Sequence, residues 1–225
     1  MNRDYTNKDL DMLNSILKIR ESFKDMPCVE LKRLKTEETV IIIIDVINGF
    51  INEGPLSDNR ISKIINPISE ILDKGEEYSK IFFVDEHTKK SKELEVYPEH
   101  CLKGSSESEL VDELKPYAGK NASVITKNST NGFNTPGFEF WLKGHKKTLK
   151  NVVIVGDCTD ICIRQFAISL KTKYNEHNDT IRVIVPMNSV DTFDLDITNH
   201  NAELMNLMAL YDMKSNGIEI VKEVV

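Results

Sequence analysis

Two cysteines, Cys158 and Cys162, follow the apolar run NVVIVG in the segment GDCTDIC. Cys162 would lie one turn into a helix that begins there, and the free N–H groups of a helix start lower the pKa of a thiol and favour an anion. A thiolate at that place can attack a carbonyl carbon, while neighbouring backbone amides hold the oxyanion that forms. The alternative is that both cysteines are small buried residues that pack the first turn of the helix.

Asp45 and Lys127 also end apolar runs, TVIIIID and SVITK. Asp45 could accept the thiol proton, because burial raises the pKa of a carboxyl group towards that of a useful base. Lys127 could hold this carboxylate in place and offset its charge. The alternatives are a carboxylate that caps the following loop and a lysine that extends to water.

The segment VDEHTKKSKELEVYPEHCLKG contains residue types that bind divalent metals. Asp85 and His87 alternate in an extended stretch, so both can face one side, and His100 lies in a loop that can fold back. These ligands suit Zn²⁺, with Fe²⁺ or Mn²⁺ as alternatives, and Glu93 is a further candidate ligand. Cys101 is not expected to bind the metal because adjacent side chains diverge. The alternative is a set of solvated loop residues.

Six apolar, β-branched runs predict strands at 39–45, 80–85, 123–127, 151–156, 181–186 and 218–224. Apolar residues at helical spacing predict helices within 61–75, 107–119, 159–177 and 197–211. This alternation predicts a three-layer α/β/α fold around a mainly parallel sheet of about six strands.

The candidate residues follow four different predicted strands, and each one comes where its strand ends. Ligands of open parallel sheets bind beyond the carboxyl ends of the strands. We therefore expect an acid, an acid with a histidine, a lysine and a thiol to converge in one cleft.

Residues 8–24 predict an amphipathic helix ahead of the first strand, with its apolar side formed by Leu10, Leu13, Ile16, Leu17 and Phe23. We expect this helix to pack on the domain or on a second subunit. The chain then divides into a helical extension, residues 1–36, and one domain, residues 37–225.

Composition limits the classes of partner. The 225 residues are 40% hydrophobic, enough for a full core. The net charge of −7 is dispersed, which argues against nucleic acid and anionic membranes as partners.

His145, His177 and His200 lie in polar surroundings, and we interpret them as surface residues. No run is long enough to span a bilayer, and the N-terminal residues are unlike a signal peptide. Four cysteines then fit a reducing cytoplasm.

Taken in order, these motifs resemble those of the isochorismatase-like cysteine hydrolases, and within them the nicotinamidases. The resemblance rests on the segments IIIID, DEH, YPEHCLKGS, ITKNSTNGF and GDCTDIC, and runs from about residue 38 to the C-terminus. It implies that Asp45, Lys127 and Cys162 form a catalytic triad. It also implies a cis peptide between Asp157 and Cys158, with the Cys158 N–H in an oxyanion hole.

The resemblance further implies that the candidate metal ligands named above hold the pyridine nitrogen of the substrate, and that Phe50 and Tyr97 sandwich its ring. The implied reaction converts a small carboxamide, with nicotinamide as the leading candidate, into an acid and ammonia through a thioester. A homo-oligomer in the cytoplasm that acts on a small molecule is the implied context.

Three positions depart from the usual nicotinamidase motifs: Gly49 stands where an aspartate is common, and Glu86 and Tyr97 stand where tryptophan is common. These departures leave open a metal-independent hydrolase of another small amide, an N-carbamoyl compound or a vinyl ether. A third hypothesis is a binding or scaffold protein without catalytic activity.

Overall fold

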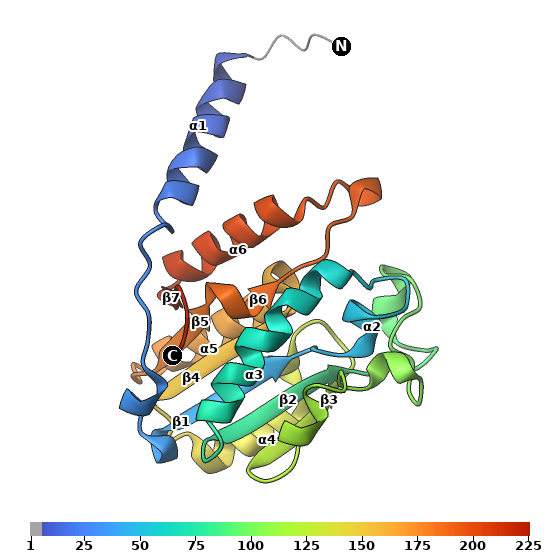
Figure 1. Cartoon of the computed structure of the whole chain (residues 1–225), viewed down its shortest axis with the longest axis vertical. Helices are drawn as coiled ribbons and strands as arrows, with labels where there is room; N and C mark the ends of the chain where they lie inside the picture. The colour runs from blue at the N-terminus through green and yellow to red at the C-terminus, as the bar shows by residue number, and fades with distance from the viewer. Residues whose placement is uncertain (1–5) are drawn as a thin grey trace.

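A parallel sheet forms the centre of the computed structural model, which describes residues 6–225 (Figure 1). Its strands are β1 (Thr39–Ile44), β2 (Ser79–Asp85), β3 (Ala122–Lys127), β4 (Asn151–Asp157), β5 (Arg182–Pro186), β6 (Val190–Asp191) and β7 (Glu219–Val221). Their order is β3-β2-β1-β4-β5-β7, with β6 beside β4, and the paired strands are parallel. The prediction of a mainly parallel sheet is confirmed. The seventh strand, β6, has two residues and is too short to leave a pattern.

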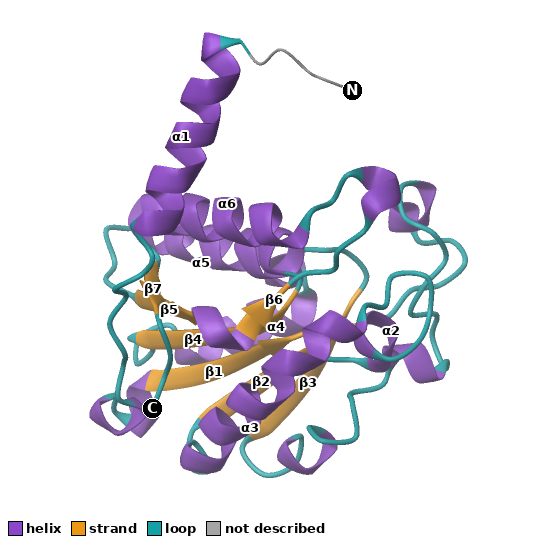
Figure 2. Ribbon diagram, turned by 45° about the horizontal axis from the view of Figure 1, so that its top comes forward, coloured by secondary structure: helices purple, strands orange, loops and turns teal. Residues whose placement is uncertain are grey.

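Helices cover both faces of this sheet, as predicted. The helices of residues 6–225 are α1 (Asn7–Glu21), which lies apart from the sheet, α2 (Asn48–Ile51), α3 (Ile65–Lys74), α4 (Pro136–His145), α5 (Arg164–Glu176) and α6 (Ala202–Ser215). Helix α3 packs on one face, and α4, α5 and α6 pack on the other (Figure 2). Within residues 6–225 there is no helix with the length and apolar character that a membrane crossing requires.

Alternation along β1 explains why the sheet is buried on both sides. All six of its residues are buried. Ile41 and Ile43 belong to the core cluster beneath α3, whereas Ile42 and Ile44 belong to the cluster beneath α4, α5 and α6. Successive side chains of a strand point to opposite faces, so a continuous apolar run gives each layer of helices its own core.

The helix predicted within 107–119 is wrong. This segment forms only short 3₁₀ turns, and its apolar residues Leu110 and Val111 pack against the loop after β1, where the Val111 N–H donates to the Val46 carbonyl at 3.2 Å. Pro116 removes a backbone donor and restricts the helical conformation of the residue before it. Helix α4, which was not predicted, follows β3 and covers the sheet instead.

Helix α1 extends away from the sheet and its covering helices (Figure 1). The Thr6 side chain caps its start. None of its residues is buried, and the exposed apolar ones are Leu10, Met12, Leu13 and Leu17. Ile19, near the end of the helix, packs against the core, and Phe23, over whose ring the Lys214 ammonium lies at 5.0 Å, is buried in it. The predicted helix is therefore present, but Leu10, Leu13 and Leu17 of its predicted apolar side stay exposed; residues 1–5 of the predicted extension lie outside the described residues.

Candidate active site

The carboxyl ends of β3, β2, β1 and β4 bring the candidate residues together. Lys127 ends β3, Asp85 ends β2, and these two residues pair directly in the parallel register. Asp45 follows β1, and its N–H donates to the Phe83 carbonyl of β2 at 3.0 Å. Asp157 ends β4 and is fully buried. Four neighbouring strands thus bring their end residues to one edge of the sheet, as expected for the carboxyl ends of parallel strands.

Two backbone features shape this edge. Asp45 has a left-handed backbone with φ of 56°, which turns the chain as it leaves β1. Gly156 has φ of 120° and pairs with Ile44, and a Cβ atom there would lie 2.0 Å from the Ile44 carbonyl oxygen. Only glycine has no Cβ and accepts such a φ, so β4 can run this close to β1 because position 156 is glycine.

Lys127 lies between two carboxylates. Its Nζ is 2.9 Å from Asp45 Oδ2 and 2.9 Å from Asp85 Oδ1, and all three side chains are buried. Burial alone would lower the pKa of Lys127, but the two carboxylates outweigh it and raise that pKa well above its usual value. Burial opposes the ionisation of Asp85, yet Lys127 and hydrogen bonds with His100 and His87 hold the pKa of Asp85 far below its usual range. Lys127 is therefore a permanent ammonium ion at the centre of the site.

The acid–base character of Asp45 and Cys162 follows from burial. Burial raises the pKa of Asp45 to about 6, although the Lys127 ammonium opposes the shift. Burial also raises the pKa of the Cys162 thiol well above its usual value, and Lys127 opposes this shift too. The thiol pKa is therefore raised and not lowered as expected, because the loss of solvation of a buried thiolate outweighs the attraction of the Lys127 ammonium. At neutral pH the site thus holds a thiol beside an ionised carboxylate.

Cys162 lies in the π-helical turn Thr159–Ile163, which leads from β4 into α5. The Cys158 carbonyl accepts hydrogen bonds from the N–H groups of Ile161 and Ile163, at 3.1 and 3.2 Å. The peptide bond between Asp157 and Cys158 is cis. Both cysteines are buried, and both line the pocket described below.

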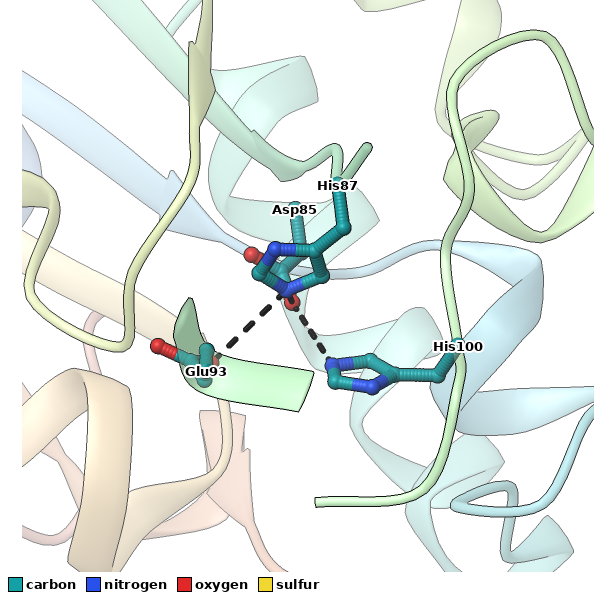
Figure 3. Close-up of side chains that lie close together, drawn as sticks. All are labelled: Asp85, His87, Glu93 and His100. Carbon is teal, nitrogen blue, oxygen red and sulfur yellow. Dashed lines mark hydrogen bonds and ion pairs between the residues drawn. The ribbon is translucent and has the colours of Figure 1, made fainter. Parts of the chain in front are cut away.

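Asp85, His87, Glu93 and His100 form a cluster in which each residue offers a ligand atom within 4.8 Å of the others (Figure 3). Asp85 Oδ2 lies 2.9 Å from His87 Nε2 and 3.1 Å from His100 Nε2. His87 Nε2 is 3.7 Å from Glu93 Oε1. The structure therefore brings together all four residues that the sequence marked as metal ligands.

The donor set of this cluster fits a divalent metal. His100 Nδ1 lies 2.7 Å from the Pro98 carbonyl oxygen, which can only accept, so Nδ1 carries the hydrogen and the neutral ring has its lone pair on Nε2. His87 Nδ1 is likewise 3.0 Å from the Asn128 side-chain oxygen. Both Nε2 atoms face Asp85 Oδ2, so without a metal each must carry a proton to donate to that oxygen, whereas beside a metal ion each can offer it a lone pair.

A pocket of about 310 Å³, including the space at its mouth, joins the cysteine turn to this cluster. Its walls include both cysteines and three of the four metal-ligand candidates; the remaining lining residues are Phe50, Leu56, Tyr97, Thr130, Ile161 and Phe193. The ring centroids of Phe50 and Tyr97 lie 5.8 and 6.2 Å from that of His100. The pocket is thus small and largely apolar, with the cysteine turn at one end and the candidate metal ligands at the other.

Sequence reasoning missed part of this wall. Phe193 lines the pocket from a loop after β6, and Thr130 lines it while its N–H donates to Glu93 Oε2 at 2.8 Å. His200, interpreted from the sequence as a surface residue, is instead partly buried and contacts Asp160 Oδ2 at 2.9 Å. His145 and His177 are exposed, as predicted. Nothing in the spacing of these residues signalled the contacts, because they depend on how two loops fold over the sheet.

Comparisons with known proteins agree with this architecture. The family model for the isochorismatase domain matches residues 39–212, well over half of the chain. A curated protein, Nicotinamidase 1 of Arabidopsis thaliana, is 30% identical over 211 residues, which cover 82% of this chain and 85% of that protein.

Two solved structures share the fold. The pyrazinamidase of Pyrococcus horikoshii in complex with zinc is 24% identical with a TM-score of 0.65, and the match covers 82% of this chain and 99% of that one. The N-carbamoylsarcosine amidase of Thermoplasma acidophilum is 21% identical with a TM-score of 0.66, and the match covers 82% of this chain and 96% of that one. At these identities the likeness concerns the fold alone.

Proposed function

The chain belongs to the isochorismatase family, and we propose that it is a cysteine-dependent hydrolase of the carbon–nitrogen bond of a small carboxamide, with nicotinamide as the leading substrate. The products are the carboxylic acid and ammonia. The observation that carries the proposal is the position of Lys127, 2.9 Å from both Asp45 and Asp85, because it joins the base beside the thiol to the cluster that can bind a metal.

In the first half of the proposed reaction, Asp45 takes the proton of the Cys162 thiol. The pKa of Asp45, raised to about 6 by burial, leaves the carboxylate ionised and ready to accept a proton at neutral pH. The thiolate attacks the carboxamide carbon, and the backbone N–H groups of Cys158 and Cys162 hold the oxyanion. Asp45 then returns the proton to the departing nitrogen, so ammonia leaves and a thioester remains.

In the second half, water hydrolyses the thioester. Asp45 accepts a proton from the attacking water, the same backbone groups hold the second oxyanion, and the carbon–sulfur bond breaks. The proton then returns to the Cys162 sulfur, which restores the thiol and releases the carboxylic acid. Lys127 stays protonated throughout and keeps Asp45 in reach of the sulfur.

We propose that Asp85, His87, His100 and Glu93 hold a divalent metal, with Zn²⁺ as the best match to two imidazoles and two carboxylates. When bound, such an ion supplies a Lewis acid that can hold a ring nitrogen of the substrate. Asn128 and the Pro98 carbonyl orient the two imidazoles.

The pocket supports a small, flat substrate. The aromatic residues Phe50, Tyr97 and Phe193 form much of its wall. A planar ring can stack on such side chains while its carboxamide points at Cys162. The 30% identical nicotinamidase makes nicotinamide the first compound to test.

The decisive test is ammonia release by the purified protein from nicotinamide, pyrazinamide and N-carbamoyl amines. Cys162→Ala should abolish hydrolysis while the fold, followed by circular dichroism, stays intact. The matched control is Cys28→Ala, which removes an exposed thiol and should leave activity unchanged. Turnover retained in Cys162→Ala would rule out the proposed nucleophile. Full activity of metal-free protein, or a preference for N-carbamoyl amines, would favour the metal-independent alternative.

We further propose that the protein is a cytoplasmic homo-oligomer. All four cysteines are free thiols, which suits a reducing compartment. The exposed leucines of α1, Leu10, Leu13 and Leu17, form an apolar side that a second subunit could cover. Sedimentation of the full chain and of a variant with these leucines changed to serine tests this proposal. If the helix mediates assembly, the variant should sediment as a species of lower mass than the wild type.

A further inference from the structure

We propose that Phe193 is a substrate-contacting wall of the pocket, and that His200 holds it in place by tying residues 193–200 to Asp160 in the cysteine turn. Phe193 is then a specificity-determining residue and His200 a positioning residue that acts through it. This inference rests on the proposed function, because it concerns the binding of the same substrate.

Residues 193–200 form a loop between β6 and α6. Leu195 and His200 close the loop through an antiparallel bridge: the Leu195 N–H donates to the His200 carbonyl at 2.9 Å, and the His200 N–H donates to the Leu195 carbonyl at 3.1 Å. At its start, Phe193 reaches the pocket that Cys158 and Cys162 also line. The loop therefore places one aromatic ring against the reacting end of the site.

The side chain of His200 makes three contacts that fix this ring. Its Nδ1 lies 2.9 Å from the Phe193 carbonyl oxygen, and its Nε2 lies 2.9 Å from Asp160 Oδ2. The imidazole also stacks on the Phe193 ring, with centroids 4.2 Å apart and an angle of 27° between the planes. One imidazole thus contacts the backbone and ring of Phe193 and, on its other side, the turn that carries Cys162.

The hydrogen-bonding roles of these atoms suit an imidazole that donates from both nitrogens. The Phe193 carbonyl and the Asp160 carboxylate both accept, so the two bonds together need a hydrogen on each ring nitrogen. The other oxygen of Asp160, Oδ1, is buried without a hydrogen-bond partner among residues 6–225. Arg164 bonds only the main-chain oxygen of Asp160, at 3.0 Å, and pairs with Asp212 instead. Asp160 therefore depends on His200 for its carboxylate contact.

Other contacts hold the loop to the body of the protein but not to the cysteine turn. The Asp194 N–H donates to Asp58 Oδ2 at 2.8 Å, and Asp194 Oδ1 accepts from the Ala202 N–H at 3.2 Å. Loss of the His200 side chain should thus free Phe193 from the cysteine turn while the loop stays attached. None of these groups touches Asp45 or Lys127, so the bond-breaking machinery should stay intact.

The first test compares steady-state kinetics of His200→Ala, Phe193→Ala and the double variant. Each single change should raise KM for nicotinamide about tenfold with kcat within about twofold, the size expected for losing an apolar contact in a pocket. If His200 acts through Phe193, the double variant should be no worse than either single variant. A KM within about twofold of wild type in His200→Ala, or additive effects in the double variant, would overturn the proposal.

The control is His177→Ala, the same substitution at the exposed position directly after the C-terminal end of α5, and it should leave KM unchanged. A second measurement is independent of activity: hydrogen exchange of the Leu195 amide should be faster in His200→Ala than in wild type or the control. If the Leu195 amide exchanges at the same rate in His200→Ala as in wild type, the proposed tether is wrong, even if the enzyme is active. If wild type hydrolyses no amide, the proposed function fails, while the exchange experiment still tests the tether.

Discussion

The two regions of the site, the strand ends and the loops, are built differently. Asp45, Asp85 and Lys127 are buried at the ends of neighbouring strands and are joined by ion pairs of 2.9 Å. Tyr97 and Phe193 are partly exposed loop residues, and each packs beside a histidine ring. Sheet register therefore fixes the groups that we propose to react, whereas loop contacts shape the pocket that we propose the substrate enters. Changes at strand ends should affect both stability and catalysis, and changes in the loops should affect substrate binding.

The largest effect is expected for Lys127→Ala, which leaves two buried carboxylates without their cation. Breaking such a buried pair lowers the free energy of unfolding by about 3–5 kcal/mol, and loss of the group that orients Asp45 should lower kcat by about a thousandfold. Urea denaturation and ammonia release measure the two losses. The exposed Lys143, 3.1 Å from Glu139, is the control, and its change to alanine should cost less than about 0.5 kcal/mol. Equal effects at the two positions would contradict the comparison.

The second effect concerns pH. Asp45 must be ionised to accept the thiol proton, and its pKa is raised to about 6, so kcat/KM should fall tenfold per pH unit below about pH 6. An exposed carboxylate would titrate near its ordinary value of about 4. Asp45→Asn should lower kcat by about 10²- to 10⁴-fold. A pH profile whose acid limb lies near 4 would show that Asp45 is not the buried base.

The third effect concerns Asn128, which links the strand ends to the loops. Asn128 follows the strand-end Lys127, and its side-chain oxygen contacts His87 Nδ1 at 3.0 Å and accepts from Ser91 Oγ at 2.5 Å. Asn128→Ala should weaken Zn²⁺ binding about 10- to 100-fold, because the ring of His87 loses the partner that orients it. Competition with a chelating dye measures the affinity, and the exposed Asn175→Ala is the control. Unchanged affinity would mean that the cluster does not need this support.

The smallest effect is expected in the loops. Tyr97→Ala removes a ring beside His100 and should raise KM about three- to tenfold with little change in kcat or in urea stability. Tyr97→Phe keeps the ring and should behave like wild type. A large loss of kcat in Tyr97→Ala would place this loop residue with the reacting groups and blur the difference between the two regions.

The predictable part of the site is the part that lies at strand ends. Continuous apolar runs identified β1 and β2, and the ionisable residue that ends each run was a strong candidate because a charge there must be paired or solvated. The chain between β2 and β3 was harder to predict. Leu110, Val111 and Leu114 have helical spacing, yet Leu110 and Val111 pack against the loop after β1, so their burial depends on a distant segment. His200 was misjudged for the same reason, since polar neighbours in sequence say nothing about Asp160 in space.

By itself, the sequence determined the six longer strands and the ionisable groups at their ends, because a continuous apolar run is a local property of the chain. The order of the strands was decided only in three dimensions: β1 lies between β2 and β4, so that Lys127 reaches Asp45 and Asp85 together. The raised pKa of Asp45, near 6, also belongs to the folded protein, since it arises when packing removes water from a carboxylate.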